Sequence, residues 1–215
     1  MGNFFIQNKK VTAKKYLQFI RNTDRGHSVW CQEVDEPRRH SHSVDNSGRP
    51  DDPVLGVSWY DAHAYCAYVG GRLPTAEEWE RVVMGKSGNL FPWGDYEDPL
   101  ESEIALKSFL EKKNDEKHEL IKSMWIHGPE WTSSKGWDND KDTRILKGLP
   151  SVVLLGENKM LDRKSYFSYL STLRQPTEPK KKLKDARFRC VFDHQPTYLE
   201  QIFKSSGRMT AKSIE

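Results

Sequence analysis

The sequence predicts a mixed fold in which short helices and strands are separated by irregular segments. Three observations lead to this prediction. The segment 53–94 contains two short helices with their own start and stop signals. A short apolar run typical of a strand occurs at 4–6, close to the N-terminus. Polar stretches rich in glycine, proline and charge separate these elements, and such stretches are typical of loops.

The first helix of the 53–94 segment is predicted to begin at a capping box. Ser58 is the expected N-cap and Asp61 lies three residues later, so each side chain can bond the other residue's backbone N–H. Apolar residues then recur at helical spacing on one face: Trp59, Ala62, Cys66 and Val69. Gly70 and Gly71 end the helix, because glycine takes the left-handed conformation without a Cβ penalty.

The second helix has the same signals. Thr75 and Glu78 form a second capping box, and Gly85 is the stop. Its apolar side consists of Trp79, Val82 and Val83. A turn with a large aromatic residue follows at 92–94. Near the N-terminus, the apolar run 4–6 predicts a strand, and Thr12 is expected to cap a helix from about Ala13 to Asn22.

Together these residues form a long and specific pattern. The matching positions are Val57-Ser58-Trp59, Asp61-Ala62, Tyr65-Cys66, Arg72-Leu73-Pro74-Thr75, Glu77-Glu78-Trp79-Glu80 and Pro92-Trp93-Gly94. This pattern resembles the formylglycine-generating-enzyme/sulfatase-modifying-factor (FGE-sulfatase) family. Further matches are Glu130-Trp131-Thr132, the strand 144–148 and the terminal strand 187–191. The resemblance implies a C-type-lectin-like α+β fold with short helices, few strands and much irregular structure.

The expected organisation is one FGE-sulfatase-like domain over residues 1–193, followed by a partly disordered tail at 194–215. Residues 95–122 depart from the family. They have the composition of a charged helical insertion, with Pro99 suited to a first helical turn. The insertion has a partial apolar stripe, which either docks onto the domain or binds a partner.

Composition excludes several function classes. The 215 residues carry a formal net charge of +3, which is too balanced to indicate nucleic-acid binding. No apolar run is long enough for a membrane helix, and the N-terminus lacks the layout of a signal peptide. The three cysteines lie far apart and predict no disulfide framework, with Cys190 standing alone. A cytoplasmic location is therefore expected.

The resemblance also sets an expectation about catalysis. In active formylglycine-generating enzymes two cysteines follow the strand matched here by 144–148, and they bind copper and activate oxygen. Soft thiolates are needed to hold Cu(I). This chain has no cysteine between Cys66 and Cys190. We therefore predict a pseudoenzyme with no cofactor and no catalytic residue.

Metal sites other than copper have weaker signals. The block around Glu130 belongs in the family to a calcium-linked loop, but the family's Gly-Asn-Val-Trp is replaced by Ile126-His127-Gly128-Pro129. Imidazole suits calcium poorly, because calcium prefers oxygen. One alternative function is an enzyme with a divergent metal site at His40, His42 and His127. Another is a lectin-like carbohydrate binder, although the calcium signatures of true C-type lectins are absent.

The favoured hypothesis is a protein-binding or regulatory module with a protein partner. The candidate partner-binding residues are Ile104, Phe109 and Leu110 in the insertion, and Tyr198, Ile202 and Phe203 in the tail. The use of related domains in bacteria suggests a bacterial regulatory or defence complex as the setting.

Overall fold

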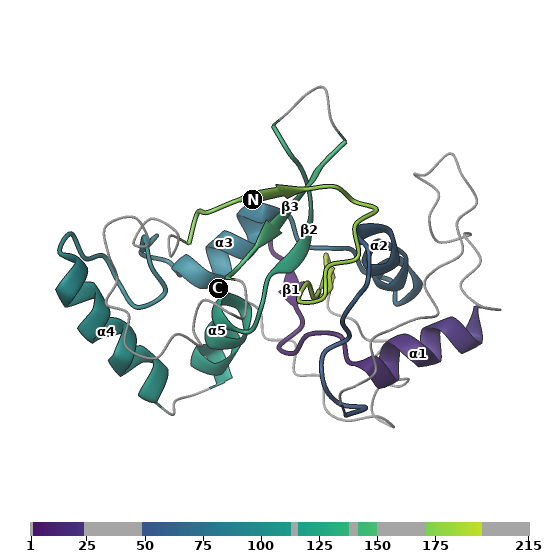
Figure 1. Cartoon of the computed structure of the whole chain (residues 1–215), viewed down its shortest axis with the longest axis horizontal. Helices are drawn as coiled ribbons and strands as arrows, with labels where there is room; N and C mark the ends of the chain where they lie inside the picture. Colours follow the sequence, from purple (N-terminus) through teal and green to yellow (C-terminus); the bar gives the residue numbers. More distant parts are fainter. Residues whose placement is uncertain (1, 24–48, 113–115, 138–141, 150–170, 195–215) are drawn as a thin grey trace.

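The computed structural model describes residues 2–23, 49–112, 116–137, 142–149 and 171–194, and it is α+β as predicted (Figure 1). The elements in chain order are β1 (Phe5–Ile6), α1 (Ala13–Asn22), α2 (Trp59–Tyr68), α3 (Ala76–Met84), α4 (Pro99–Glu111), α5 (Glu116–Ile126), β2 (Glu130–Lys135), β3 (Arg144–Lys147), β4 (Gln175–Thr177) and β5 (Val191–Phe192). Helices and strands are short, and much of the described backbone between them is irregular.

The helix boundaries follow from the capping residues. Both predicted capping boxes are present, Ser58 with Asp61 at the start of α2 and Thr75 with Glu78 at the start of α3. Thr12 caps α1 by accepting a hydrogen bond from the Lys15 N–H. Each cap satisfies backbone N–H groups that the first helical turn leaves without partners. Local sequence therefore determines where these three helices begin.

Two small antiparallel sheets connect distant parts of the chain. β1 pairs with β5, which joins the N-terminal segment to the end of the domain. β2, β3 and β4 form the second sheet in that order, with Trp131 opposite Leu146 and Ile145 opposite Pro176. β3 is the central strand of this sheet, and all four of its residues are buried.

The buried apolar residues form two clusters. One lies around α1 and α2 and includes Tyr16, Phe19, Trp59, Tyr65 and Phe188. The other lies around α3, α4 and α5 and includes Trp79, Phe91, Met124 and Trp125. Figure 1 shows the corresponding arrangement, with α1 and α2 on one side of the central sheet and α4 and α5 on the other.

The cysteines differ from the prediction. Cys66 and Cys190 form a disulfide, with their Cα atoms 5.4 Å apart. The interpretation of Cys66 as an unpaired core residue and of Cys190 as standing alone is therefore wrong. The physical reason is an antiparallel contact between Arg72, just after α2, and Val191 in β5. This contact brings together two thiols that are 124 residues apart in the sequence.

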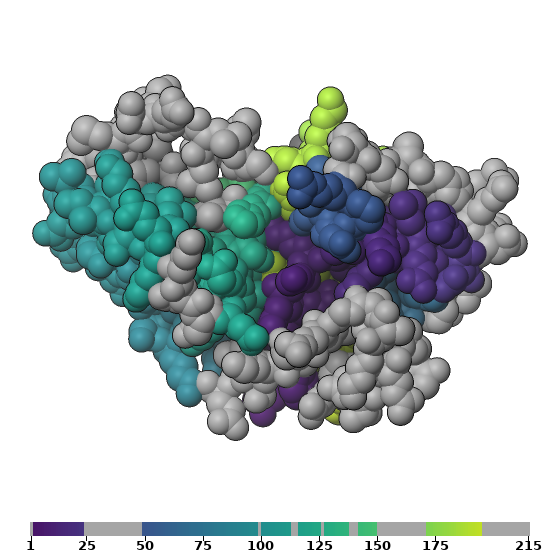
Figure 2. Space-filling model, turned by 90° about the horizontal axis from the view of Figure 1, so that it is seen from below, coloured from purple at the N-terminus to yellow at the C-terminus, as the bar shows by residue number. Residues whose placement is uncertain are grey.

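The 95–122 region is helical, as predicted, but contains two helices. Asp98 caps α4, and Pro99 occupies its first turn. The second helix, α5, continues through Met124 and Trp125 to Ile126, so the start of the family-like block is helical here. Figure 2 shows the teal atoms of this region gathered on one side of the molecule. Within the described residues, no helix is long and apolar enough to cross a membrane.

Candidate functional site

The first candidate site lies at the end of β3, where the resemblance places the catalytic loop. Lys147 is the last residue of this strand, and its side chain is fully buried. Its ammonium group donates to the carbonyl oxygens of Ser171 at 2.7 Å and Leu173 at 2.6 Å. It also lies 3.0 Å from a carboxylate oxygen of Glu80. Lys147 thus joins β3, α3 and the segment that leads into β4.

A surface guanidinium extends this cluster. Arg174 binds Glu80 at 2.8 Å and Glu77 at 2.7 Å, so these two acids of α3 are each paired with a cation. Burial lowers the pKa of Lys147 to about 8, although Glu80 acts in the opposite direction. Three oxygen atoms around one ammonium group leave it no free position for attack on a substrate. The cluster therefore holds the loop in place and offers no free acid–base pair.

The second cluster is deeper and centres on Glu130 at the start of β2. Both carboxylate oxygens of Glu130 accept from Arg189 at 2.8 Å, and one also accepts from the Trp79 indole at 3.2 Å. The side chains of Glu130 and Arg189 are completely buried. Burial favours a higher pKa for Glu130, but the charges of Arg189 and Lys10 outweigh it and hold the pKa below its usual value.

Lys10 completes this buried cluster from the N-terminal side. Its ammonium group lies 3.3 Å from Glu130 and donates to the backbone carbonyls of His127 and Gly128. Burial lowers the pKa of Lys10 to about 7, with Glu130 opposing the shift. Arg189 also donates to the carbonyl of Gln7. The cluster therefore fastens the N-terminal segment to the turn that follows α5.

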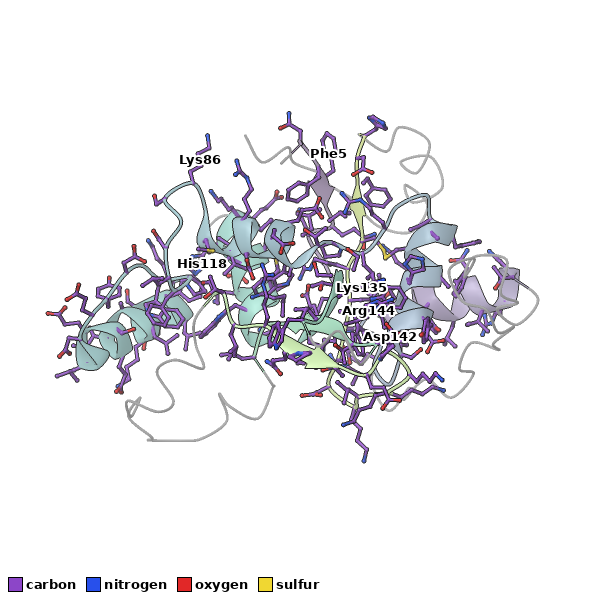
Figure 3. All side chains as sticks on the ribbon, turned by 90° about the horizontal axis from the view of Figure 1, so that it is seen from above. Phe5, Lys86, His118, Lys135, Asp142 and Arg144 are labelled. Carbon is purple, nitrogen blue, oxygen red and sulfur yellow. A yellow bond between two sulfur atoms is a disulfide. The ribbon has the colours of Figure 1, made fainter. Side chains whose placement is uncertain are left out.

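A third group of polar residues lies at the far end of the central sheet. Figure 3 shows Lys135, Asp142 and Arg144 close together, and Arg144 forms an ion pair with Asp142. The Arg144 guanidinium also lies over the Trp59 ring, 4.4 Å from its centroid. A cation stacked on an aromatic face is a stabilising arrangement. We assign this group to packing between β3 and α2.

The predicted metal ligands are not brought together in the described part of the chain. His40 and His42 lie outside the described residues. His127 is exposed, and its carbonyl oxygen rather than its ring contacts Lys10. Among the residues that the structure describes, no three His, Cys, Asp or Glu side chains form a group that could hold a metal ion.

The predicted partner-binding residues separate into two groups. On α4, Ile104 is 61% exposed, and Leu100, one turn earlier, is 55% exposed. Phe109 faces inward and packs against Trp93 and His118, so its side chain serves docking of α4 onto the domain. Leu110 is partly buried against the same core cluster. Tyr198, Ile202 and Phe203 lie outside the described residues.

A family profile decides the classification. The profile of the sulfatase-modifying factor enzyme 1-like domain matches residues 1–194. The chain belongs to the FGE-sulfatase family. Among FGE-sulfatase relatives, a bovine (Bos taurus) formylglycine-generating enzyme is 32% identical over 189 residues, covering 74% of this chain and 49% of the relative. The bovine inactive Cα-formylglycine-generating enzyme 2 is 34% identical over 116 residues, covering 45% of this chain and 37% of the relative.

Two solved structures share the FGE-sulfatase-like fold. The crystal structure of CarF aligns with a TM-score of 0.55 at 14% identity, covering 89% of this chain and 87% of that one. The variable protein 1 of Treponema denticola aligns with a TM-score of 0.56 at 13% identity, covering 89% and 84%. These likenesses concern the fold alone. The chain spans about half, or less, of the length of the curated relatives named above.

Lys147 and Lys10, two members of the buried clusters of this FGE-sulfatase domain, were not predicted from the sequence. Lys147 directly follows Ile145 and Leu146 in β3, and a charged residue in a buried strand is a signal that a partner must exist. Nothing in the sequence around Lys10 indicates burial, because two consecutive lysines are typical of an exposed segment. Its partner Glu130 lies far along the chain, beyond the reach of local patterns.

Proposed function

We propose that this chain is a catalytically inactive FGE-like domain that works as a protein-binding or regulatory module. The observation that carries the proposal is the use of its cysteines. The sequence has three, and two of them are joined in the Cys66–Cys190 disulfide. Only Cys31 is then left as a thiol.

Copper chemistry of the family type needs two thiolates near each other, because soft sulfur ligands select Cu(I). At the end of β3 the described residues contain a lysine–carboxylate cluster, in which Lys147 of β3 pairs with Glu80 of α3. Such hard groups do not replace thiolates toward Cu(I). Relatives named inactive Cα-formylglycine-generating enzyme 2 support the same interpretation.

The binding role is supported by the outward face of α4. Leu100 and Ile104 lie one helical turn apart, on the side opposite the buried Leu106 and Phe109. Neighbouring exposed apolar residues on a helix that is already docked through its other face are typical of an interaction site. We therefore expect a protein partner to contact α4 through these two side chains.

Two measurements test the lack of catalysis. The purified protein is analysed for bound copper, and a cysteine-containing sulfatase peptide is followed by mass spectrometry for conversion to formylglycine. A formylglycine-generating enzyme is run in parallel as the positive control. We expect neither stoichiometric copper nor conversion. Copper at one atom per chain together with peptide conversion would refute the proposal.

The binding role is tested by affinity purification of the tagged protein from its native cells. The double variant Leu100→Glu/Ile104→Glu should lose the partner. The matched control is Trp137→Glu, which removes an exposed apolar side chain, 65% accessible, from the loop after β2. Circular dichroism and thermal melting establish that both variants are folded. Retention of the partner by the α4 variant would exclude this surface.

A further inference from the structure

The turn between α5 and β2 surrounds a single buried ammonium group with oxygen atoms. The Lys10 Nζ lies 2.6 Å from the His127 carbonyl oxygen and 2.9 Å from that of Gly128. The third oxygen, Oε1 of Glu130, is 3.3 Å away. All three acceptors come from four consecutive residues, whereas Lys10 arrives from the other end of the chain. Only 3% of the Lys10 side chain is exposed.

Two carbonyl oxygens and one carboxylate oxygen form a typical ligand set for a hard cation. The turn also lies in the block that, by resemblance, is linked to calcium in the family. The position between the three oxygens, however, is filled by the Lys10 ammonium. In this structure the residues do not fit a calcium ion, because the centre of the oxygen set is already filled by a positive charge.

The surrounding charges disfavour a divalent ion as well. Glu130 is already bonded through both oxygens to Arg189, so one carboxylate faces two cations. Arg187 lies against the same turn and would collide with a Cβ added at Gly128. Calcium sites use six to eight oxygens and usually several carboxylates. Replacing one positive charge by two beside these guanidinium groups would increase the repulsion.

The backbone of the turn is arranged for this contact. Gly128 has φ +80°, a left-handed conformation that favours glycine. Both the His127 and the Gly128 carbonyls then face Lys10, which satisfies buried oxygens that would otherwise lack a donor. Replacing Lys10 by a residue without an ammonium group would therefore remove the cation that contacts the His127 and Gly128 carbonyl oxygens and Oε1 of Glu130.

We propose that the Lys10 ammonium is the built-in cation of the 127–130 turn, taking the place of a calcium ion and making this domain independent of calcium. This role of Lys10 goes beyond the proposed function and is tested independently of it, because it concerns stability of the fold and not catalysis or partner binding.

The experiment measures thermal unfolding of the protein at pH 6, where Lys10 carries its proton. Wild-type protein is melted with EDTA and with millimolar CaCl₂, and calcium binding is measured by titration calorimetry. Two variants are compared, Lys10→Met, which keeps the aliphatic stem, and Lys9→Met at the exposed neighbouring position. We expect an unchanged wild-type Tm in EDTA and calcium, and no calcium binding.

For Lys10→Met we expect a fall in Tm of about 10 °C, since two backbone carbonyls lose their donor and Glu130 loses one of its two buried cations, and for Lys9→Met almost none. Equal Tm values for the two variants would overturn the proposal. A wild-type Tm that rises with CaCl₂ or falls with EDTA would overturn it as well. If Lys10→Met does not fold, the wild-type measurements decide alone, because a calcium-dependent turn must respond to the metal.

Discussion

Removing the Cys66–Cys190 disulfide should destabilise the domain more than any surface change. The perturbation is the double variant Cys66→Ala/Cys190→Ala, which removes both sulfurs and leaves no buried thiol. The cross-link closes a loop across 124 positions of the chain. In the unfolded state a cross-link across so long a loop removes much conformational freedom, so its loss lowers the free energy of unfolding.

The magnitude follows from the loop length. The chain-entropy relation gives roughly 5 kcal/mol at 25 °C for a loop of this size, at the upper end of the range of about 2–5 kcal/mol for native disulfides. For a chain of about 200 residues, 1 kcal/mol shifts Tm by about 2–4 °C, so a loss near the upper end lowers Tm by about 10–20 °C. Both sulfurs are fully buried, and the cavity left by each substitution adds to the loss.

The assay is urea unfolding followed by tryptophan fluorescence, with Cys31→Ala as the control that removes a cysteine but no cross-link. We expect the control to unfold like wild type. Thiol titration of denatured, unreduced protein should find a single reactive thiol, because the sequence has three cysteines and two are bonded. Three reactive thiols, or a double variant as stable as the control, would refute the reasoning.

Three further predictions concern the caps and the buried charges. Thr75→Ala removes the N-cap of α3 and should lower the free energy of unfolding by about 1 kcal/mol in urea titrations. An unchanged free energy of unfolding would contradict a stabilising role for this cap. Glu130→Gln leaves Arg189 without its charge partner and should cost about 3–5 kcal/mol or prevent folding, whereas Glu119→Gln, at an exposed ion pair on α5, should cost less than about 1 kcal/mol. Burial lowers the pKa of Lys147 from 10.5 to about 8 in the folded protein, so between these two pH values the unfolded chain binds this proton more strongly than the folded one. The free energy of unfolding should therefore rise between pH 8 and pH 10.5. Lys147→Met should reduce that rise, and an unchanged pH dependence would contradict the lowered pKa of Lys147.

The sequence predicted those parts of the fold that depend on neighbouring residues. Ser58 with Asp61 and Thr75 with Glu78 interact within one helical turn, so their side chains alone specify where α2 and α3 begin. The same holds for Gly85, whose positive φ ends α3. A capping signal is complete within four residues, and no tertiary contact is needed to interpret it.

The disulfide and the buried charge clusters depend on contacts that no local pattern contains. Cys66 looked like a core residue because its helix face is apolar, and that is also the environment of a buried disulfide. Its pairing with Cys190 became visible only when α2 and β5 were seen side by side. The expectation of a cytoplasmic location rested in part on the absence of a disulfide framework, and that support is lost because Cys66 and Cys190 are joined.

The candidate site gives the clearest case of this limit. The absence of paired cysteines after β3 was evident from the sequence, because an absent atom needs no structure to be noticed. The buried charge clusters near this strand were not evident. Lys147 and Glu80 meet only because β3 packs against α3, and Lys10 meets Glu130 only because the N-terminal segment crosses the turn after α5. Loss of a thiol site and gain of internal cations are separate changes, so stability of Lys147 and Lys10 variants can be tested without any assumption about the partner of α4.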